Sequence, residues 1–168
     1  MGEMAKKIVR TDLENLLKIL NEAYAEEWLA YYQYWVAAKI AYGQERTAIV
    51  GEFKEHAAEE LKHADWLADR IIQLGGIPVL EPMSWNELAH CKYIIPHNFN
   101  VSALLHDNLE AERCAIGRYE GICDITHGRD YETYRISEKI LKEEIEHEQE
   151  LEDFLADIEQ TCKKINQS

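Results

Sequence analysis

The segments EELKHADWLADRIIQLGG, residues 59–76, and LKEEIEHEQELEDFL, residues 141–155, share a spacing that decides the fold. In each, a glutamate is followed three residues later by a histidine; the pairs are Glu60 with His63 and Glu144 with His147. On a helix this spacing places both side chains on one face. The rest of that face is apolar in both segments, so the pairs are predicted to lie inside a helical protein.

Two other segments carry a single carboxylate in the middle of an apolar helical stripe. Glu27 falls on the face that also holds Leu20 and Tyr31, whereas its neighbour Glu26 points elsewhere. Glu112 has the equivalent place in a later segment. One glutamate from each of two helices, with Glu-x-x-His from each of two others, is the ligand set of a di-metal centre in a helix bundle.

Four carboxylates buried together in an apolar core would repel one another and lose their hydration. Two divalent metal ions supply up to four positive charges and remove that cost. The predicted ligands are Glu27, Glu60, His63, Glu112, Glu144 and His147. The register around Glu144 stays open at this stage, because Glu143, Glu146 and Glu148 are close neighbours.

Helical periodicity runs through four long segments, and no segment has the alternation of a strand. The predicted helices cover residues 11–42, 46–74, from 98 or 100 to 127, and 131–161. Glycines at positions 43, 75, 76 and 128 mark the ends of the first three. The short links between the first and second helices and between the third and fourth predict two antiparallel hairpins.

The remaining connection, Gly75 to His97, holds all three prolines and a candidate short helix, SWNELAHCKY, at residues 84–93. It is long enough to run the length of a neighbouring helix of about 42 Å. One long crossover between two helical hairpins is typical of ferritin-like bundles. The predicted fold class is therefore all-α, a ferritin-like four-helix bundle forming one domain over residues 1–168.

Composition excludes several classes of function. The formal net charge of −14 argues against a nucleic-acid partner, because phosphate binding needs a basic face. No run of about eighteen apolar residues is present, so no membrane span is expected. The N-terminal stretch lacks the apolar core of a secretory signal, which predicts a cytoplasmic protein. An acidic surface would instead attract cations.

Two residues near the predicted ligands have alternative interpretations. His56 lies two turns before His63 on nearly the same face. It is interpreted either as an outer metal ligand or entry ligand, or as a hydrogen-bonded core histidine. Tyr34 lies two turns after Glu27 on the inward face. It is interpreted either as a packed core residue, or as a hydrogen-bonding or redox-active tyrosine beside the metals.

Four stretches resemble the helices of bacterioferritins and their Dps-like relatives: EEWLAYYQYW, EELKHADWLADRIIQLGG, LEAERCAIGRYEGIC and LKEEIEHEQELEDFL. The resemblance covers about residues 20–158. It implies that Glu27 and Glu112 are terminal ligands and that Glu60 and Glu144 bridge two irons. His63 and His147 would then each hold one iron.

Two features place the chain within that superfamily. Bacterioferritins have a haem-ligating methionine directly after the second-helix glutamate, but this chain has Leu61, so no haem is predicted. LAHCKY and AERCAIG resemble the cysteine-bearing Dps-like proteins, the thioferritins, in which a cysteine pair lies near the centre. The resemblance implies pairing of Cys91 with Cys114, with a redox role left open. Cys123 lies three turns after Glu112 on the inward face of its predicted helix, which indicates a core thiol.

The expected activity is that of a ferroxidase, which oxidises Fe(II) to Fe(III) at a di-iron centre with two irons per subunit. Hydrogen peroxide is the expected oxidant, with dioxygen as the alternative. The family resemblance implies a homo-oligomeric cage, a dodecamer, for iron storage and oxidative-stress protection. The rival functions are a rubrerythrin-like peroxidase and a manganese catalase, which share the centre but store nothing.

Overall fold

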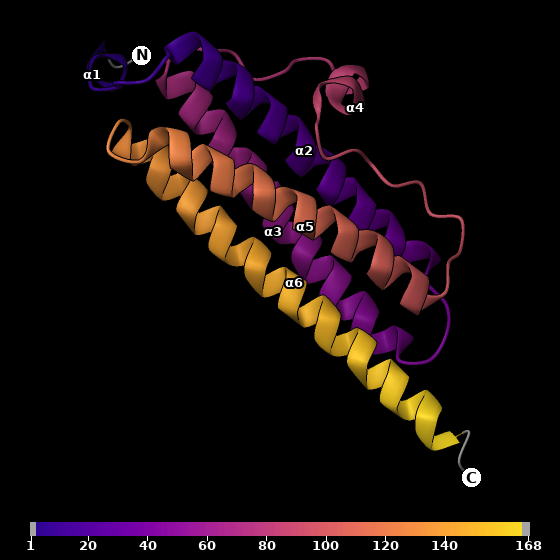
Figure 1. Cartoon of the computed structure of the whole chain (residues 1–168). Coiled ribbons are helices and arrows are strands. Elements are labelled where there is room, and N and C mark those ends of the chain that lie inside the picture. Colours follow the sequence, from indigo (N-terminus) through magenta and orange to yellow (C-terminus); the bar gives the residue numbers. More distant parts are fainter. Residues whose placement is uncertain (1–2, 166–168) are drawn as a thin grey trace.

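The computed structural model describes residues 3–165 and confirms the predicted four-helix bundle. Helices α2 and α3 form one antiparallel hairpin, and α5 and α6 form a second one that lies against it (Figure 1). The four helices are α2 (Leu13–Ile40), α3 (Arg46–Gln73), α5 (Val101–Thr126) and α6 (Tyr131–Ile165). Within the described residues there is no strand, and no helix is long and apolar enough to cross a membrane.

Side-chain caps fix where two of these helices begin. The carboxylate of Asp12 accepts hydrogen bonds from two N–H groups of the first turn of α2. The helix therefore begins at Leu13, two residues after the predicted start at Thr11. Of the two alternatives for α5, Asn100 is the cap, because its side chain accepts from the N–H of Ser102. Asn98 instead accepts from the N–H of Asn100 in the preceding loop.

Helix α3 ends at the predicted glycine pair. The N–H of Gly76 donates to the carbonyl of Ile71, and the N–H of Gly75 donates to that of Ile72, each at 2.9 Å. Gly75 has φ +77°, a left-handed conformation that glycine adopts without steric cost. A Cβ on Gly76 would lie 2.7 Å from Leu17, so the chain leaves α3 in close contact with α2.

Two helices differ from the prediction at the ends of the chain. A short helix, α1 (Glu3–Lys7), was not predicted, because five residues carry no readable apolar period. Helix α6 continues to Ile165 rather than ending near Thr161, since no glycine or proline interrupts it.

The short helix in the crossover is smaller than predicted. A 3-10 turn, η1 (Pro82–Ser84), leads into one helical turn, α4 (Trp85–Leu88), rather than a helix over residues 84–93. The indole of Trp85 stacks on that of Trp28, with ring centroids 5.1 Å apart, which holds α4 against α2. Beyond α4 the crossover runs along the outside of the bundle as extended chain (Figure 1).

The carboxylate of Glu26 explains why α4 stops. It accepts hydrogen bonds from the backbone N–H groups of His90 and Cys91, at 2.6 and 3.3 Å, so those groups are not available to extend the helix. The guanidinium of Arg118 donates to both oxygens of the same carboxylate. The helical pattern excluded Glu26 from the predicted metal ligands, and the structure shows that it instead anchors the crossover to α2 and α5.

Apolar side chains fill the bundle in two separate clusters. One contains residues from the C-terminal halves of α2 and α6 and the N-terminal halves of α3 and α5; its largest members are Tyr34, Phe53, Leu104, Leu105 and Leu151. The other contains the opposite ends of those helices, with Leu16, Leu20, Leu67, Ile71, Tyr119 and Ile140. The predicted metal ligands occupy the layer between the two clusters.

A buried ion pair joins the end of α3 to the start of α6. The guanidinium of Arg70 donates to both oxygens of Asp130 at 2.8 Å and to the hydroxyl of Thr133 at 2.8 Å. Arg70 and Asp130 are each 2% exposed. Although burial raises the pKa of Asp130, hydrogen bonds from Arg70 and Thr133 lower it overall, so the carboxylate stays charged and paired.

Removing one partner would leave the other charge buried and unpaired. We therefore expect Arg70→Ala to destabilise the metal-free protein by about 3–5 kcal/mol, measured by denaturant unfolding. Arg113→Ala is the matched control, because Arg113 pairs with Glu148 and Glu152 on the surface. Equal stability of the Arg70 variant and the parent protein would contradict this role.

Candidate metal centre

The six predicted ligands meet in one buried layer of the bundle. Helices α2 and α5 each contribute one glutamate, and α3 and α6 each contribute a glutamate and a histidine one turn later. None of the six is more than 3% exposed. Because the i, i+3 pairs of α3 and α6 lie on facing sides of the bundle, their side chains point into the same space.

One group of ligands surrounds His63. Its Nδ1 lies 3.4 Å from Glu27, 3.3 Å from Glu60 and 3.2 Å from Glu144, measured to carboxylate oxygens. One ligand atom from each of these four residues lies within 4.8 Å of the others, a spacing that suits a single metal ion.

A second group surrounds His147. Its Nδ1 lies 3.4 Å from oxygens of Glu60 and Glu144 and 3.8 Å from Glu112. These four residues also offer ligand atoms within 4.8 Å of one another. Glu60 and Glu144 belong to both groups, so the arrangement matches two neighbouring metal positions with two shared carboxylates. The same arrangement identifies Glu144, rather than its neighbours Glu143, Glu146 or Glu148, as the residue of α6 that faces both positions.

The outer nitrogen of each histidine is held by a further carboxylate. Nε2 of His63 lies 2.8 Å from Glu143, and Nε2 of His147 lies 2.8 Å from Glu59. Such bonds fix the ring so that Nδ1 faces the centre, and they make the imidazole a better metal donor. The sequence pattern missed these two roles, although each carboxylate directly precedes a predicted ligand in the chain.

Two buried tyrosines donate to the carboxylates that are not shared. The hydroxyl of Tyr34 donates to Glu112, and that of Tyr119 donates to Glu27. Burial, together with the adjacent carboxylate, raises the pKa of both phenols, so both stay protonated and act as donors. Tyr34 thus occupies the hydrogen-bonding position that was one of its two alternatives, and Tyr119, to which the sequence analysis gave no role, occupies the matching position at Glu27.

Protons balance the charge of the metal-free layer. Burial raises the pKa of Glu27 and of Glu112 well above the usual range. Burial opposes protonation of His63 and His147, but the nearby carboxylates favour the charged rings and raise both pKa values overall. Metal ions that bind here must therefore displace protons, because ligands coordinate in their deprotonated form.

The donor atoms fit two divalent cations. Several buried ligand atoms have no hydrogen-bond partner within the described residues: Glu27 Oε2, Glu60 Oε1, both oxygens of Glu144, and Nδ1 of His147. A buried unpartnered polar atom is costly, and metal coordination would satisfy all of these at once. Four carboxylates and two imidazoles suit iron or manganese, which favour hard oxygen donors with nitrogen.

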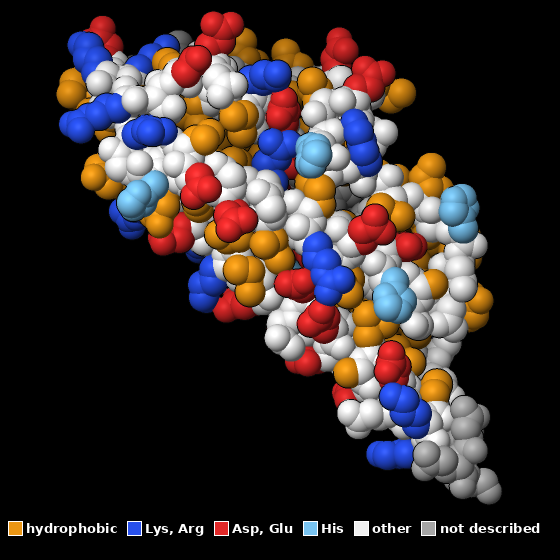
Figure 2. Space-filling model, viewed as in Figure 1, with side chains coloured by type: hydrophobic (Ala, Val, Ile, Leu, Met, Phe, Trp, Pro, Cys, Tyr) orange, Lys and Arg blue, Asp and Glu red, His pale blue; other side chains and the backbone are white. Residues whose placement is uncertain are grey.

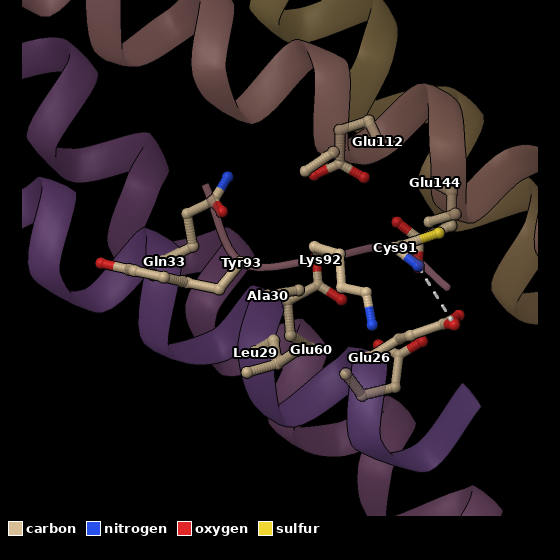
Figure 3. A pocket seen from close by; sticks show the side chains of 13 residues that line it. Glu26, Leu29, Ala30, Gln33, Glu60, Cys91, Lys92, Tyr93, Glu112 and Glu144 are labelled. Atoms are coloured by element: carbon tan, nitrogen blue, oxygen red, sulfur yellow. Dashed lines mark hydrogen bonds between the residues drawn. The ribbon is translucent and has the colours of Figure 1, made fainter. Parts of the chain in front are cut away.

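Two openings lead towards the centre. A small cavity on the crossover side is lined by Cys91 and Tyr93 together with Glu27, Glu60, Glu112 and Glu144 (Figure 3). On the opposite side, a groove between α3 and α6 is lined almost entirely by acidic residues and histidines: Glu52, Glu55, His56, Ala58, Glu59, Glu143, Glu146, His147 and Glu150.

His56 lies between that acidic groove and the centre. It is 1% exposed, its Nε2 lies 2.9 Å from Glu150 and 3.4 Å from Glu52, and its ring stacks on that of His147 at 4.0 Å. Burial, followed by the charge of His147, lowers the pKa of His56, so the neutral ring can accept a cation. Both alternatives from the sequence, a hydrogen-bonded histidine and an entry ligand, are compatible with this position.

The two cysteines named from the family resemblance form a disulfide. Cys91 in the crossover is joined to Cys114 on α5, with Cα atoms 5.7 Å apart. Cys123 is half-buried rather than fully in the core, and burial raises the pKa of its thiol to about 11. Cys162 is exposed near the end of α6.

The carboxylates behind the histidines provide a test of this geometry. We expect Glu143→Ala and Glu59→Ala each to weaken divalent metal binding about 10–100-fold, because the ligand ring loses its orienting bond. Glu146→Ala is the matched control, since Glu146 lines the same groove but pairs with Lys142. Calorimetric titration with Mn(II) measures the effect, and unchanged affinity in both variants would contradict the assigned roles.

Comparison with known proteins agrees with this architecture. The model of the ferritin-like domain family matches residues 17–161. A DNA protection during starvation protein from Pyrococcus furiosus is 38% identical over 145 residues, which cover 86% of this chain and 78% of that protein.

Two solved structures extend the comparison. The dodecameric thioferritin of Bacteroides fragilis, a bacterioferritin-related protein, is 49% identical, with a TM-score of 0.95 over 97% of this chain and 98% of that one. A ferritin-like diiron-carboxylate protein from Bacillus anthracis is 26% identical, with a TM-score of 0.72 over 85% of this chain and 96% of that one. The chain belongs to the ferritin-like family and resembles its thioferritin and Dps members.

Proposed function

We propose that the protein is a ferroxidase that binds two Fe(II) ions in the bundle and oxidises them to Fe(III). The observation that supports this most is the pair of four-ligand groups that share Glu60 and Glu144. Shared carboxylates keep two metal ions close together, so that two electrons can pass to one oxidant molecule. Two mononuclear sites further apart would deliver single electrons.

Each ligand has a distinct task in this proposal. Glu27 and His63 hold one iron, Glu112 and His147 hold the other, and Glu60 and Glu144 bridge them. The hydroxyls of Tyr34 and Tyr119 orient the carboxylates of Glu112 and Glu27. Anionic oxygen ligands stabilise the ferric product more than the ferrous substrate, which favours oxidation.

Hydrogen peroxide is the proposed oxidant. Two Fe(II) ions, one peroxide and two protons give two Fe(III) ions and two water molecules. Because both electrons arrive at one peroxide, no hydroxyl radical is released. Fe(II) would enter through the acidic groove between α3 and α6, where the carboxylates raise the local concentration of cations.

Storage of the ferric product requires an enclosed assembly of many chains. The thioferritin of Bacteroides fragilis is described as dodecameric and matches almost the whole of this chain. We therefore propose a homo-oligomeric cage of twelve subunits, with the oxidised iron deposited inside it.

An anaerobic Fe(II) titration followed by peroxide tests the activity. We expect saturation at two irons per chain and one peroxide consumed for every two irons oxidised. Glu60→Ala and Glu144→Ala remove shared ligands, so each is expected to abolish fast oxidation. Faster oxidation by dioxygen would overturn the proposed oxidant, and binding without any oxidation would overturn the ferroxidase proposal itself.

Protection of DNA in this proposal comes from the removal of iron and peroxide, without DNA binding. The net charge is −14, and on the face in Figure 2 the Lys and Arg side chains are interspersed with Asp and Glu. A gel-shift assay at low salt is expected to show no retarded DNA, since charge attraction supplies most non-specific binding. Retardation that disappears at higher salt would contradict this prediction.

A further inference from the structure

The two openings that lead towards the metal centre differ greatly in size. The groove between α3 and α6 has a volume of about 510 Å³, whereas the cavity on the crossover side has about 30 Å³. One water molecule needs about 10–15 Å³ on this scale, so the cavity holds about two molecules of that size. A metal ion that still carries a shell of water molecules is too large for it, but hydrogen peroxide is not.

Small apolar side chains form much of the wall of this cavity. Ala30 of α2 and Ala111 and Ala115 of α5 line it, and all three are half-buried rather than packed into the core. The cavity also reaches the carboxylate ligands, including the shared Glu60 and Glu144. It therefore joins the crossover side of the bundle to the place where both metal ions would lie.

Gln33 fixes the crossover at one end of the cavity. Its side-chain carbonyl accepts from the N–H of Ile94 at 2.9 Å. Its amide nitrogen donates to the carbonyl of Asp107 and to the side-chain oxygen of Asn108, each at 3.3 Å. Gln33 is 4% exposed and lines the cavity. One buried side chain thus joins the crossover to both α2 and α5.

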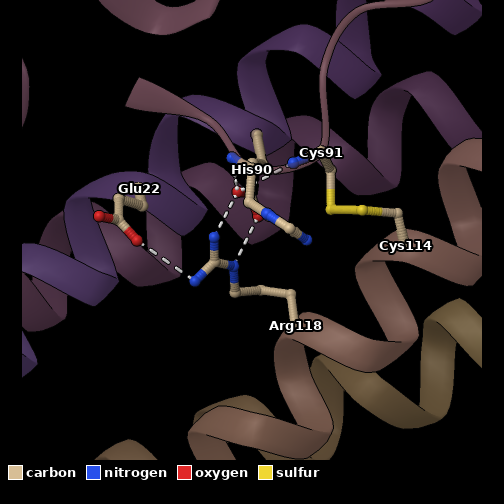
Figure 4. Close-up of a disulfide and its surroundings, with 6 residues drawn as sticks. Glu22, His90, Cys91, Cys114 and Arg118 are labelled. Carbon is tan, nitrogen blue, oxygen red and sulfur yellow. Dashed lines mark hydrogen bonds and ion pairs between the residues drawn. A yellow bond between two sulfur atoms is a disulfide. The ribbon is translucent and has the colours of Figure 1, made fainter. Parts of the chain in front are cut away.

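Glu26 fixes the crossover at the other end, about two helical turns earlier on α2. Its carboxylate accepts from the backbone N–H groups of His90 and Cys91 and from the guanidinium of Arg118. Arg118 also pairs with Glu22 at 3.3 Å (Figure 4). The short stretch of crossover between the two anchors lines the cavity (Figure 3). Because both ends of that stretch are held, the width of the opening is fixed.

The two openings also differ in charge. The groove is lined by six glutamates, whose field attracts cations. Beside the cavity, Lys92 is exposed and positive, and Arg118 neutralises the carboxylate of Glu26. Fe(II) is therefore drawn to the groove and away from the cavity. Charge does not steer an uncharged molecule to either opening, so its size decides whether it can use the narrow one.

We propose that the cavity beneath the crossover is the entry site for the oxidant, hydrogen peroxide, and that iron and oxidant reach the centre from opposite sides. The inference rests on the proposed peroxide-driven oxidation of two irons. Separate routes let peroxide meet iron that is already held by Glu60 and Glu144, where two electrons are available together. Gln33 and Glu26 are positioning residues, and the alanines of the wall set the size limit.

Larger side chains in the cavity wall test this route. Ala30→Leu and Ala115→Leu are loaded anaerobically with two Fe(II) per chain and then mixed with hydrogen peroxide in a stopped-flow instrument. We expect oxidation to slow by about 10–100-fold, because the oxidant must push aside a side chain that fills its path. Iron binding before mixing should remain at two per chain, since neither alanine is a ligand.

The matched control places the same substitution in the other opening. Ala58 lines the acidic groove, so Ala58→Leu should oxidise iron that was loaded beforehand at the parent rate. Ala30→Val adds a smaller side chain and should give a smaller decrease; it also decides the test if the leucine variants do not bind two irons. Dioxygen is small and uncharged as well, so the same measurements are made with it.

The outcomes separate this route from the proposed activity. Oxidation by peroxide at the parent rate in every cavity variant that binds two irons overturns the route and leaves the ferroxidase proposal intact. An equal decrease in Ala58→Leu, or a decrease with dioxygen alone, also overturns it. Parent protein that binds two irons but is oxidised by neither molecule overturns the ferroxidase proposal, and the route with it.

Discussion

The structure depends on the neutralisation of four carboxylates inside an apolar bundle. Glu27, Glu60, Glu112 and Glu144 sit at mid-height on four different helices, all almost fully buried. Without compensation, their desolvation and mutual repulsion would oppose folding. In the metal-free layer the compensation comes from two protonated histidines, two tyrosine hydroxyls and raised carboxyl pKa values. Two metal ions would replace those protons.

The surrounding architecture serves this polar layer. The apolar clusters above and below it supply the burial that stabilises the bundle, and the pair of Arg70 with Asp130 ties the two hairpins together at one end. Glu59 and Glu143 orient the histidines from the groove side. The two faces of the centre therefore differ: an acidic groove suited to cations on one side, and the anchored crossover with its disulfide on the other.

The fold was predictable because long-period features determine it. The fold follows from the i, i+3 pairs, the four apolar stripes and the glycines that end the helices, which together cover most of the chain. An ambiguity at one position, such as Glu26 against Glu27, could therefore be resolved by asking which residue lies on the apolar face of its helix. The shape of the crossover was not predictable in the same way. The length of α4 depends on a contact between Glu26 and N–H groups about 64 residues away in the chain, which no local pattern contains. The roles of Tyr119, Glu59 and Glu143 depend likewise on helix-to-helix distances.

The proposed function requires that two metal ions share Glu60 and Glu144 in the middle of the bundle. Anomalous X-ray diffraction at the iron edge, from crystals grown and soaked with Fe(II) without oxygen, tests it most directly. We expect two peaks per chain, one beside Nδ1 of His63 and one beside Nδ1 of His147, with both shared carboxylates between them. A single peak, or iron bound only in the outer groove near Glu52, His56 and Glu150, would contradict it.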